Sequence, residues 1–357
     1  MARRPAADVP AFPPPAAASS ERLIGHEAAE VAFLNALETG RMPHAWLITG
    51  PKGVGKATLA FRMARVLLAT PMIERADAGL FGAEPKPALS LEMPAGHPVF
   101  RRLAELAHSD FRLLRRSLND KGKLRSEIVI EDVRAAIDFL RMTPAEGDWR
   151  VLIVDAADDL NRNAANALLK ILEEPPQQSL FLLVSHAPAR VLPTILSRCR
   201  KLPLRPLATD DVIRAAAGAA NIAVDDPALI EAADASEGSV SRALTLLGGD
   251  ALKLQQRTAA LLASLPQVDP RELHVLGDAL GGSDRVALAA FIDGVDRWVG
   301  ERLRADDAHA NANLPRLARL AEVWEKINRA ARDTAEYTLE RKPLVFSVFG
   351  MLAEATR

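Results

Sequence analysis

The segment from Gly50 to Lys56 carries the clearest chemical signal in the sequence, because it matches glycine, four residues, glycine, lysine. Gly50, Gly53 and Gly55 allow backbone N–H groups to turn inward around phosphate oxygens, and Lys56 would meet the β- and γ-phosphates. The apolar run 44–48 before the segment predicts a buried strand. One helical face follows it, formed by Leu59, Met63, Val66 and Leu67. Strand, loop and helix in this order predict a phosphate-binding P-loop; a glycine-rich turn with a solvated lysine is the alternative.

Two positions that ATP hydrolysis requires carry alanine instead. Ala57 stands where a Ser or Thr hydroxyl would coordinate magnesium. Thr58 is a poor substitute, because one residue along a helix is a rotation of roughly 100°. Asp155 follows a buried strand and is placed to hold magnesium, or else is a strand-end turn residue, but Ala156 stands where a carboxylate would polarise water. General-base help is typically worth about 10²–10⁴ in rate, so we expect nucleotide binding to survive better than hydrolysis.

Apolar runs and helical spacings alternate around these residues. The runs 111–114, 128–130, 149–154 and 180–184 predict strands, and the spacings in 27–37, 131–142 and 163–173 predict helices. Five prolines between residues 70 and 127 are expected to break any long element there. The alternation predicts an α/β fold whose parallel sheet is covered on both faces. After Pro206 only helical patterns remain.

These patterns predict four segments. Residues 1–20, rich in Ala and Pro, are expected to be a disordered tail. Residues 21–205 form the nucleotide-binding-like domain and 206–250 a small helical lid. Residues 251–357 form an all-helical C-terminal domain.

The composition limits the class of protein. A net charge of −1 argues against a surface that binds nucleic acid throughout. The single cysteine, Cys199, excludes an internal disulfide and a cysteine-cluster zinc site, and it fits a cytoplasmic location. No apolar run approaches the roughly 20 residues of a membrane span, so none is predicted. Residues 101–125 contain eight Lys or Arg against three Asp or Glu; they are expected to be solvated surface, with a DNA-facing or subunit-facing patch as the alternative. No chemistry is assigned to His97 or His108.

The segments NALLKILEEPP (166–176) and FLLVSHAPARVLPTILSRC (181–199), with LIGHE (23–27) before them, resemble the bacterial DNA polymerase III clamp-loader subunits of the AAA+ family. The resemblance covers about residues 21–205. It implies a P-loop AAA+ domain, a helical lid and a C-terminal collar domain that joins a ring. It also implies that Ile24 and Gly25 lie near a nucleotide base, with His26 either beside them or simply on the surface before a helix.

The resemblance assigns a role to Arg198. In this family the arginine of Ser-Arg-Cys is an arginine finger that reaches ATP on a neighbouring subunit, a role suited to a planar, permanently charged guanidinium. The alternative is an arginine that interacts with a helix C-terminus. Ser197 would orient the turn, and Cys199 is expected to be a small buried residue. Lys170 lies on a helix that can approach DNA in this family, or is an ordinary exposed lysine.

Within the family the chain is more similar to the delta-prime branch than to the motor subunits. Motor subunits have an intact hydroxyl after the P-loop lysine, an acidic pair at the sheet edge and a four-cysteine zinc module, none of which is present in this sequence. Their arginine in Gly-Ser-x-Arg senses nucleotide, whereas Ser241 stands there and Arg242 is displaced by one.

The resemblance therefore implies a subunit of the DNA polymerase III holoenzyme, a nucleotidyltransferase, with little ATPase activity of its own. No cofactor is required, and ATP, ADP or Mg²⁺ would bind weakly or vestigially. The implied partners are the gamma/tau motor and delta subunits in a hetero-oligomeric ring, and, through it, the sliding clamp and primed DNA. The alternative is a catalytically active P-loop ATPase, which Ala57 and Ala156 oppose.

Overall fold

The computed structural model describes residues 17–77, 90–120, 122, 124–247, 250–281, 285–306, 310–337 and 339–356. Among these, residues up to 242 form one compact unit and residues from 243 onward form a second. Each unit has its own hydrophobic core.

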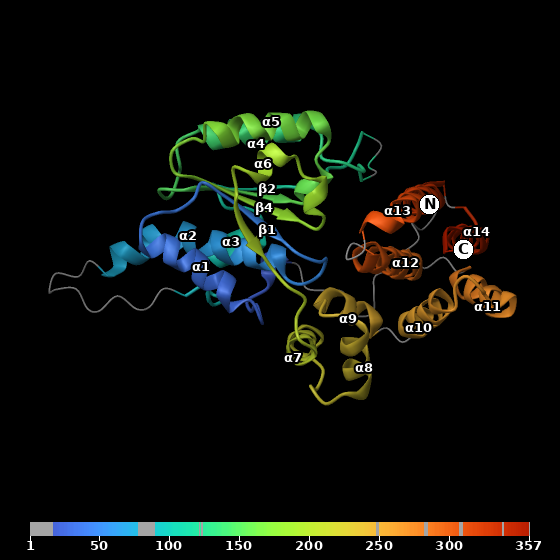
Figure 1. The fold of residues 1–357 in the computed structure, drawn as a ribbon. Coiled ribbons are helices and arrows are strands. Elements are labelled where there is room, and N and C mark those ends of the chain that lie inside the picture. The colour runs from blue at the N-terminus through green and yellow to red at the C-terminus, as the bar shows by residue number, and fades with distance from the viewer. Residues whose placement is uncertain are drawn as a thin grey trace, which may run out of the picture. The chain divides into compact units, whose positions relative to one another are not determined.

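The first unit is built on a parallel sheet of five strands (Figure 1). Their bounds are β1 Ala45–Thr49, β2 Phe111–Leu114, β3 Arg150–Asp155, β4 Ser179–Ser185 and β5 Arg200–Pro203, in the order β2-β3-β4-β1-β5. The predicted α/β fold with a parallel sheet is confirmed. The strand predicted at 128–130 is wrong, because Ile128 makes only an isolated bridge to Leu160 and Ile130 already begins a helix.

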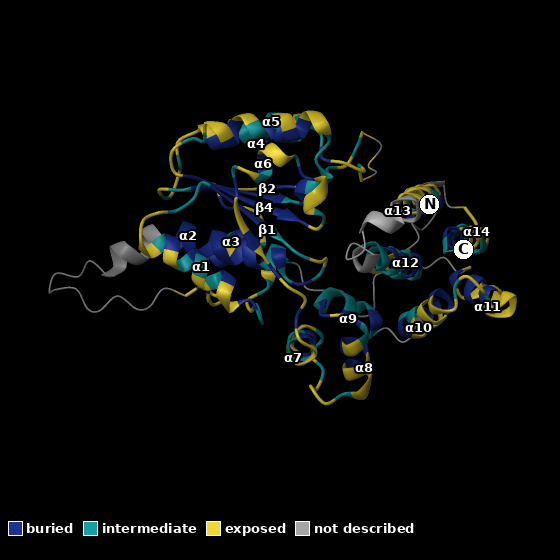
Figure 2. Cartoon of the chain, viewed as in Figure 1, coloured by how far each residue is buried: buried dark blue, intermediate teal, exposed yellow. Residues whose placement is uncertain are grey.

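Alternate residues of the central strands enter two separate cores, as the pleat requires. In β3, Val151 and Ile153 face one core, whereas Leu152 and Val154 face the other. Figure 2 shows the strands buried between the two helical layers. One layer contains α1 Glu27–Glu38, α2 Lys56–Asp77 and α3 Pro98–Ala104, and the other contains α4 Ile130–Arg141, α5 Arg162–Glu173 and α6 Pro193–Leu196. The predicted cover on both faces is confirmed.

Two features of the first layer were not predicted. Helix α2 continues past Pro71 to Asp77, so the expectation that this proline breaks the element is wrong. A proline in a helix interior costs about 3 kcal/mol, which the buried first turns of α2 offset. Helix α3 lies in a region where the prolines predict no long element. Pro98 stands in its first turn, where proline is tolerated.

In the described residues that follow β5, all regular elements are helices, as predicted. The first unit ends with α7 Thr209–Ala220, α8 Pro227–Ala235 and the start of α9 Val240–Leu246. The second unit contains α10 Asp250–Ala263, α11 Pro270–Leu280, α12 Arg285–Asp306, α13 Ala310–Tyr337 and α14 Arg341–Thr356. Its core includes Phe291, Val295, Ile327 and Phe349. The domain boundaries at 205 and 250 stay predictions.

The segment before α1 is fastened to the first unit by buried arginines of α2. Arg65 donates to the carbonyls of Ala18 and Ser20, and Arg62 donates to that of Glu21. The 3₁₀ turn Ala17–Ser19 is thus ordered although it falls within the predicted tail, whose residues 1–16 lie outside the described ones. No helix in the described parts combines the length and apolarity that crossing a bilayer demands.

Candidate nucleotide site and candidate arginine finger

The predicted P-loop connects the carboxyl end of β1 to the start of α2, as expected for strand, loop and helix. Lys56 is the first residue of α2 and is buried. Its ammonium donates to the carbonyl of Gly50 at 2.7 Å and to that of Pro51 at 2.5 Å. The lysine therefore turns back onto its own loop, and the reading as a solvated lysine is wrong.

Burial sets the electrostatics of this site. It lowers the pKa of Lys56 to about 8, with the carboxylates of Asp158 and Asp155 opposing the shift. Burial also raises the pKa of Asp155, with Lys56 opposing that shift. The structure thus brings Lys56 and Asp155, far apart in sequence, close enough to interact.

The glycines of the P-loop lie so close to other parts of the chain that a side chain would not fit. Gly50, Gly53 and Gly55 all have positive φ. A Cβ on Gly50 would fall on the Leu204 carbonyl, and one on Gly53 would fall on the Ser239 side chain. Side chains are excluded here by the fold alone, so the glycines do not by themselves require a phosphate.

The start of α9 and the residue before it are bonded directly to the P-loop. The Ser239 hydroxyl donates to the carbonyl of Lys52 at 3.0 Å, and the Ser241 backbone N–H donates to that of Gly53 at 3.3 Å. Ser241, which the resemblance aligns with the motor subunits' sensor arginine, therefore contacts the loop through its backbone. Sequence reasoning did not predict this contact, because its two sides lie nearly 190 residues apart.

The LIGHE segment also reaches the P-loop. His26 is buried, and its Nε2–H donates to the carbonyl of Val54 at 2.7 Å. The alternative of a surface histidine is therefore wrong. Gly25 has positive φ, and a Cβ there would meet the side chains of Leu207 and Asp211. Ile24 and Gly25 thus lie beside the site, and their contact with a base stays a prediction.

One acidic residue of the site was missed. Asp158 follows β3 by three residues and accepts a hydrogen bond from the His186 backbone N–H at 2.9 Å. Its charge opposes the lowering of the pKa of Lys56 more than that of Asp155 does. The acidic pair Asp158-Asp159, within four residues of the carboxyl end of a buried strand, was the available signal. Within the described ranges no group of three or more His, Cys, Asp or Glu is arranged to hold a metal ion. Lys56 supplies an ammonium that a phosphate would need, but Ala57 offers magnesium no hydroxyl.

Arg198 lies between α6 and β5, with about a third of its side chain exposed. Its Nη2 pairs with Glu173 Oε1 at 2.7 Å, and its Nη1 donates to the Thr194 carbonyl at 3.0 Å. Thr194 lies in α6, so the helix-end interaction weighed as the alternative is present. These two interactions do not use all the donors of Arg198, because a guanidinium carries five N–H groups.

Arg198 and the P-loop lie at opposite edges of the sheet. Strands β1 and β5 are parallel, with Trp46 beside Arg200 and Thr49 beside Pro203. The P-loop follows Thr49 at the carboxyl edge, whereas Arg198 precedes Arg200 at the amino edge. Arg198 therefore cannot serve the P-loop of its own chain.

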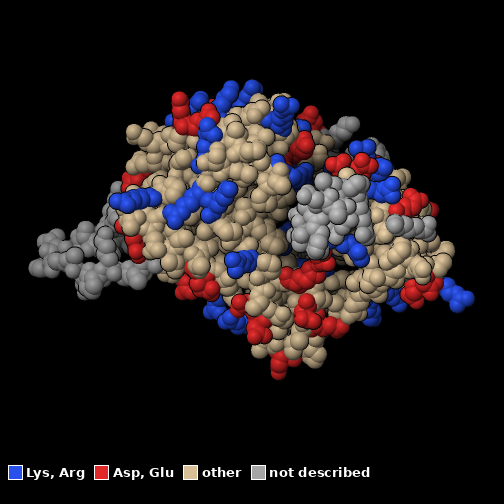
Figure 3. All heavy atoms as spheres, viewed as in Figure 1, with Lys and Arg blue, Asp and Glu red and all other residues tan. Residues whose placement is uncertain are grey.

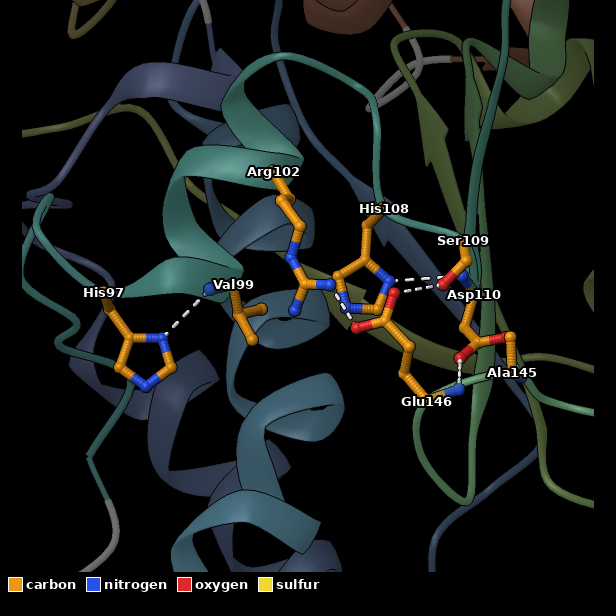
Figure 4. Close-up of polar contacts among 8 residues, drawn as sticks. All are labelled: His97, Val99, Arg102, His108, Ser109, Asp110, Ala145 and Glu146. Atoms are coloured by element: carbon orange, nitrogen blue, oxygen red, sulfur yellow. Dashed lines mark hydrogen bonds and ion pairs between the residues drawn. The ribbon is translucent and has the colours of Figure 1, made fainter.

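The remaining predicted residues take structural places. Burial raises the pKa of Cys199 to about 12, which fits a small buried residue. His97 caps α3 by accepting from the Val99 N–H, and His108 accepts from the Asp110 N–H (Figure 4). Lys170 is exposed on α5 and lines a groove of about 600 Å³ between α4 and α5.

The basic segment 101–125 does not form a uniform patch. Arg102 pairs with Glu146, and Arg116 pairs with Asp159 at 3.3 Å. Lys121 and Lys123 lie outside the described residues. Figure 3 shows basic and acidic side chains interspersed on the face in view. The reading as solvated surface stays a prediction.

The chain is similar in sequence to known subunits of DNA polymerase III. The family model described as "DNA polymerase III, delta subunit" matches residues 91–208. DNA polymerase III subunit tau of Escherichia coli is 31% identical over 251 residues, 68% of this chain and 35% of that protein. Subunit delta' of Pseudomonas aeruginosa is 38% identical over 156 residues, 44% of this chain and 41% of that protein. This chain is related to the clamp-loader subunits of DNA polymerase III.

The predicted resemblance to the clamp-loader family is thereby confirmed. The matched regions cover 35% and 41% of the length of these two relatives. A solved structure of a DNA polymerase III gamma subunit-related protein from Thermotoga maritima covers 91% of this chain and 99% of its own, with a TM-score of 0.41 and 18% identity.

Proposed function

We propose that this chain is a delta-prime-type clamp-loader subunit. It supports the ATP-driven loading of the sliding clamp onto primed DNA and lends Arg198 to the ATP site of a neighbouring motor subunit. Its partners are the gamma/tau motor and delta subunits in a hetero-oligomeric ring, in which the C-terminal helical domain forms part of the collar. The similarity to both tau and delta' supports this assignment.

The observation that carries the proposal is the position of Arg198. The side chain is partly exposed at the sheet edge opposite its own P-loop. Its guanidinium has further N–H donors that can bind an oxygen of another molecule. A neighbour that docks against this edge would place its γ-phosphate within reach of a planar, permanently charged fork. In well-studied systems such a finger contributes about 10³–10⁵ to kcat.

The chain's own site binds nucleotide weakly and hydrolyses it poorly. Bound ATP would supply a phosphoryl group, which Lys56 would hold, and Asp155 would hold magnesium. The ammonium of Lys56 would first have to leave the carbonyls of Gly50 and Pro51. Ala57 and Ala156 provide neither the hydroxyl for the metal nor the carboxylate for the water.

The alternative function is an active P-loop ATPase of the motor type. Lys56 and Asp155 are retained and lie close together, which favours it. ATPase activity of the purified chain, alone and mixed with motor subunits and primed DNA, separates the two functions. The proposal predicts negligible turnover by the chain alone and stimulated turnover in the mixture. DNA-stimulated turnover by the isolated chain would establish the alternative.

A further inference from the structure

Two acceptors from different helices hold the guanidinium of Arg198. Glu173 Oε1 accepts from Nη2 at 2.7 Å, and the Thr194 carbonyl accepts from Nη1 at 3.0 Å. The Ser197 hydroxyl lies 3.5 Å from Nη1 and itself donates to Thr194 at 3.0 Å. The long side chain is therefore restrained at both ends of its fork.

The carboxylate of Glu173 stands on a rigid support. Glu173 is the last residue of α5, whose first turn is capped by the Asn161 side chain. Leu168, Ile171 and Leu172 bury the inner face of this helix against the sheet. The side chain of Glu173 is itself 44% exposed, so it does not help to form the core.

The ion pair of Arg198 and Glu173 is strong enough to orient the guanidinium but too weak to hold it away from a phosphate. An ion pair between partly exposed side chains is worth only about 0–1 kcal/mol, so it would not prevent Arg198 from engaging a phosphate. A free arginine must lose much of its rotamer freedom when it engages, whereas a restrained one has already lost part of it.

We propose that Glu173 is a positioning residue that pre-orients the guanidinium of Arg198 for the phosphate of a neighbouring subunit. The inference rests on the proposed function, in which Arg198 acts on that neighbour. The other anchor, Thr194, acts through its backbone, so Glu173 is the anchor that a substitution can remove.

The test measures steady-state ATP hydrolysis by the reconstituted complex of this full-length chain with its motor subunits. Glu173→Ala removes the acceptor, Glu173→Gln keeps a neutral one, and Glu174→Ala is the matched control one residue along the same helix end. We expect Glu173→Ala to lower kcat by about three- to tenfold, the effect of freeing one long side chain, with KM for ATP unchanged. Glu173→Gln restores most of the rate, and Glu174→Ala equals wild type. Thermal midpoints and co-elution with the motor subunits check folding and assembly.

A double variant separates positioning from other effects. In the Arg198→Ala background, Glu173→Ala should change nothing further, because there is no guanidinium to orient. An equal loss in both backgrounds, a wild-type rate for Glu173→Ala, or a rate for Glu173→Gln as low as that of Glu173→Ala would overturn the inference. If Arg198→Ala alone left hydrolysis unchanged, the proposed function itself would fail, and that result is distinct from the others.

Discussion

At the scale of single residues, the chemistry of the P-loop depends on a buried cation and a missing hydroxyl. Lys56 is surrounded by acceptors from its own loop, and Asp155 and Asp158 lie near enough to oppose the lowering of its pKa. Ala57, in the first turn of α2, has no side-chain oxygen. The two residues have separable effects, one on stability and one on metal-dependent binding.

Replacement of Lys56 tests the cost of its burial. The pKa is about 8 in the folded chain, against 10.5 ordinarily. Between these values the unfolded state binds more protons than the folded state, so stability should rise with pH in that window. Lys56→Met should remove this rise and raise the thermal midpoint at pH 7 by about 2–4 °C. Calorimetry between pH 7 and 10.5 measures both. Lys201→Met, at an exposed position on β5, should leave the pH dependence intact.

Addition of a hydroxyl at position 57 tests the metal deficit. Ala57→Thr should make ADP binding depend on Mg²⁺, tightening it by about tenfold, because a new oxygen ligand faces the ion. It should not produce turnover, since Ala156 still provides no carboxylate. Calorimetric titration with ADP, with and without Mg²⁺, reads this out. Equal affinity of both proteins for Mg·ADP would show that the hydroxyl position is not what limits the site.

At the scale of elements, the sequence predicted most of what surrounds the site and missed what depends on long-range contact. Strands β1, β3 and β4 are buried on both faces, so their apolar runs were visible. Strand β5 was missed because Arg200 and Lys201 are exposed and only Leu202 is buried in the sheet. The contact of Ser239 with the P-loop has no local sequence signal, since it joins residues 187 positions apart in the sequence.

The turn between α4 and β3 is an element held by one buried carboxylate. Asp110, fully buried before β2, accepts from the backbone N–H groups of Ala145 and Glu146 at 2.7 and 2.8 Å (Figure 4). Arg150 lies 3.5 Å from the same carboxylate. One carboxylate thus accepts from two backbone N–H groups of the turn and faces the charge of Arg150, so the turn depends on Asp110.

Asp110→Asn should therefore destabilise the chain by about 2–4 kcal/mol, because an amide nitrogen would face backbone donors and the charge opposite Arg150 would vanish. Urea unfolding measures the difference. Asp120→Asn, an exposed change nearby, should stay within about 0.5 kcal/mol of wild type. Indistinguishable midpoints for the two variants would contradict the account of this turn.

At the scale of the whole molecule, the proposed function uses two opposite edges of the sheet in the first unit. The carboxyl edge of the sheet carries the P-loop, which is closed by Lys56 and by the segment at Ser239. The amino edge carries Arg198, which is partly exposed. In a ring of related subunits, one edge of each faces the other edge of the next, so a chain can lose its own hydrolysis and still serve its neighbour.

The measurement that tests this claim most directly is the ATPase rate of the complete complex with Arg198→Ala in this chain. The account predicts an intact assembly whose kcat at the neighbouring site falls by about 10³-fold, while Arg198→Lys, which keeps the charge without the fork, does not restore it. Arg205→Ala, two residues past the carboxyl end of β5, should have no effect. An assembled Arg198→Ala complex that hydrolyses ATP at the wild-type rate would contradict the account.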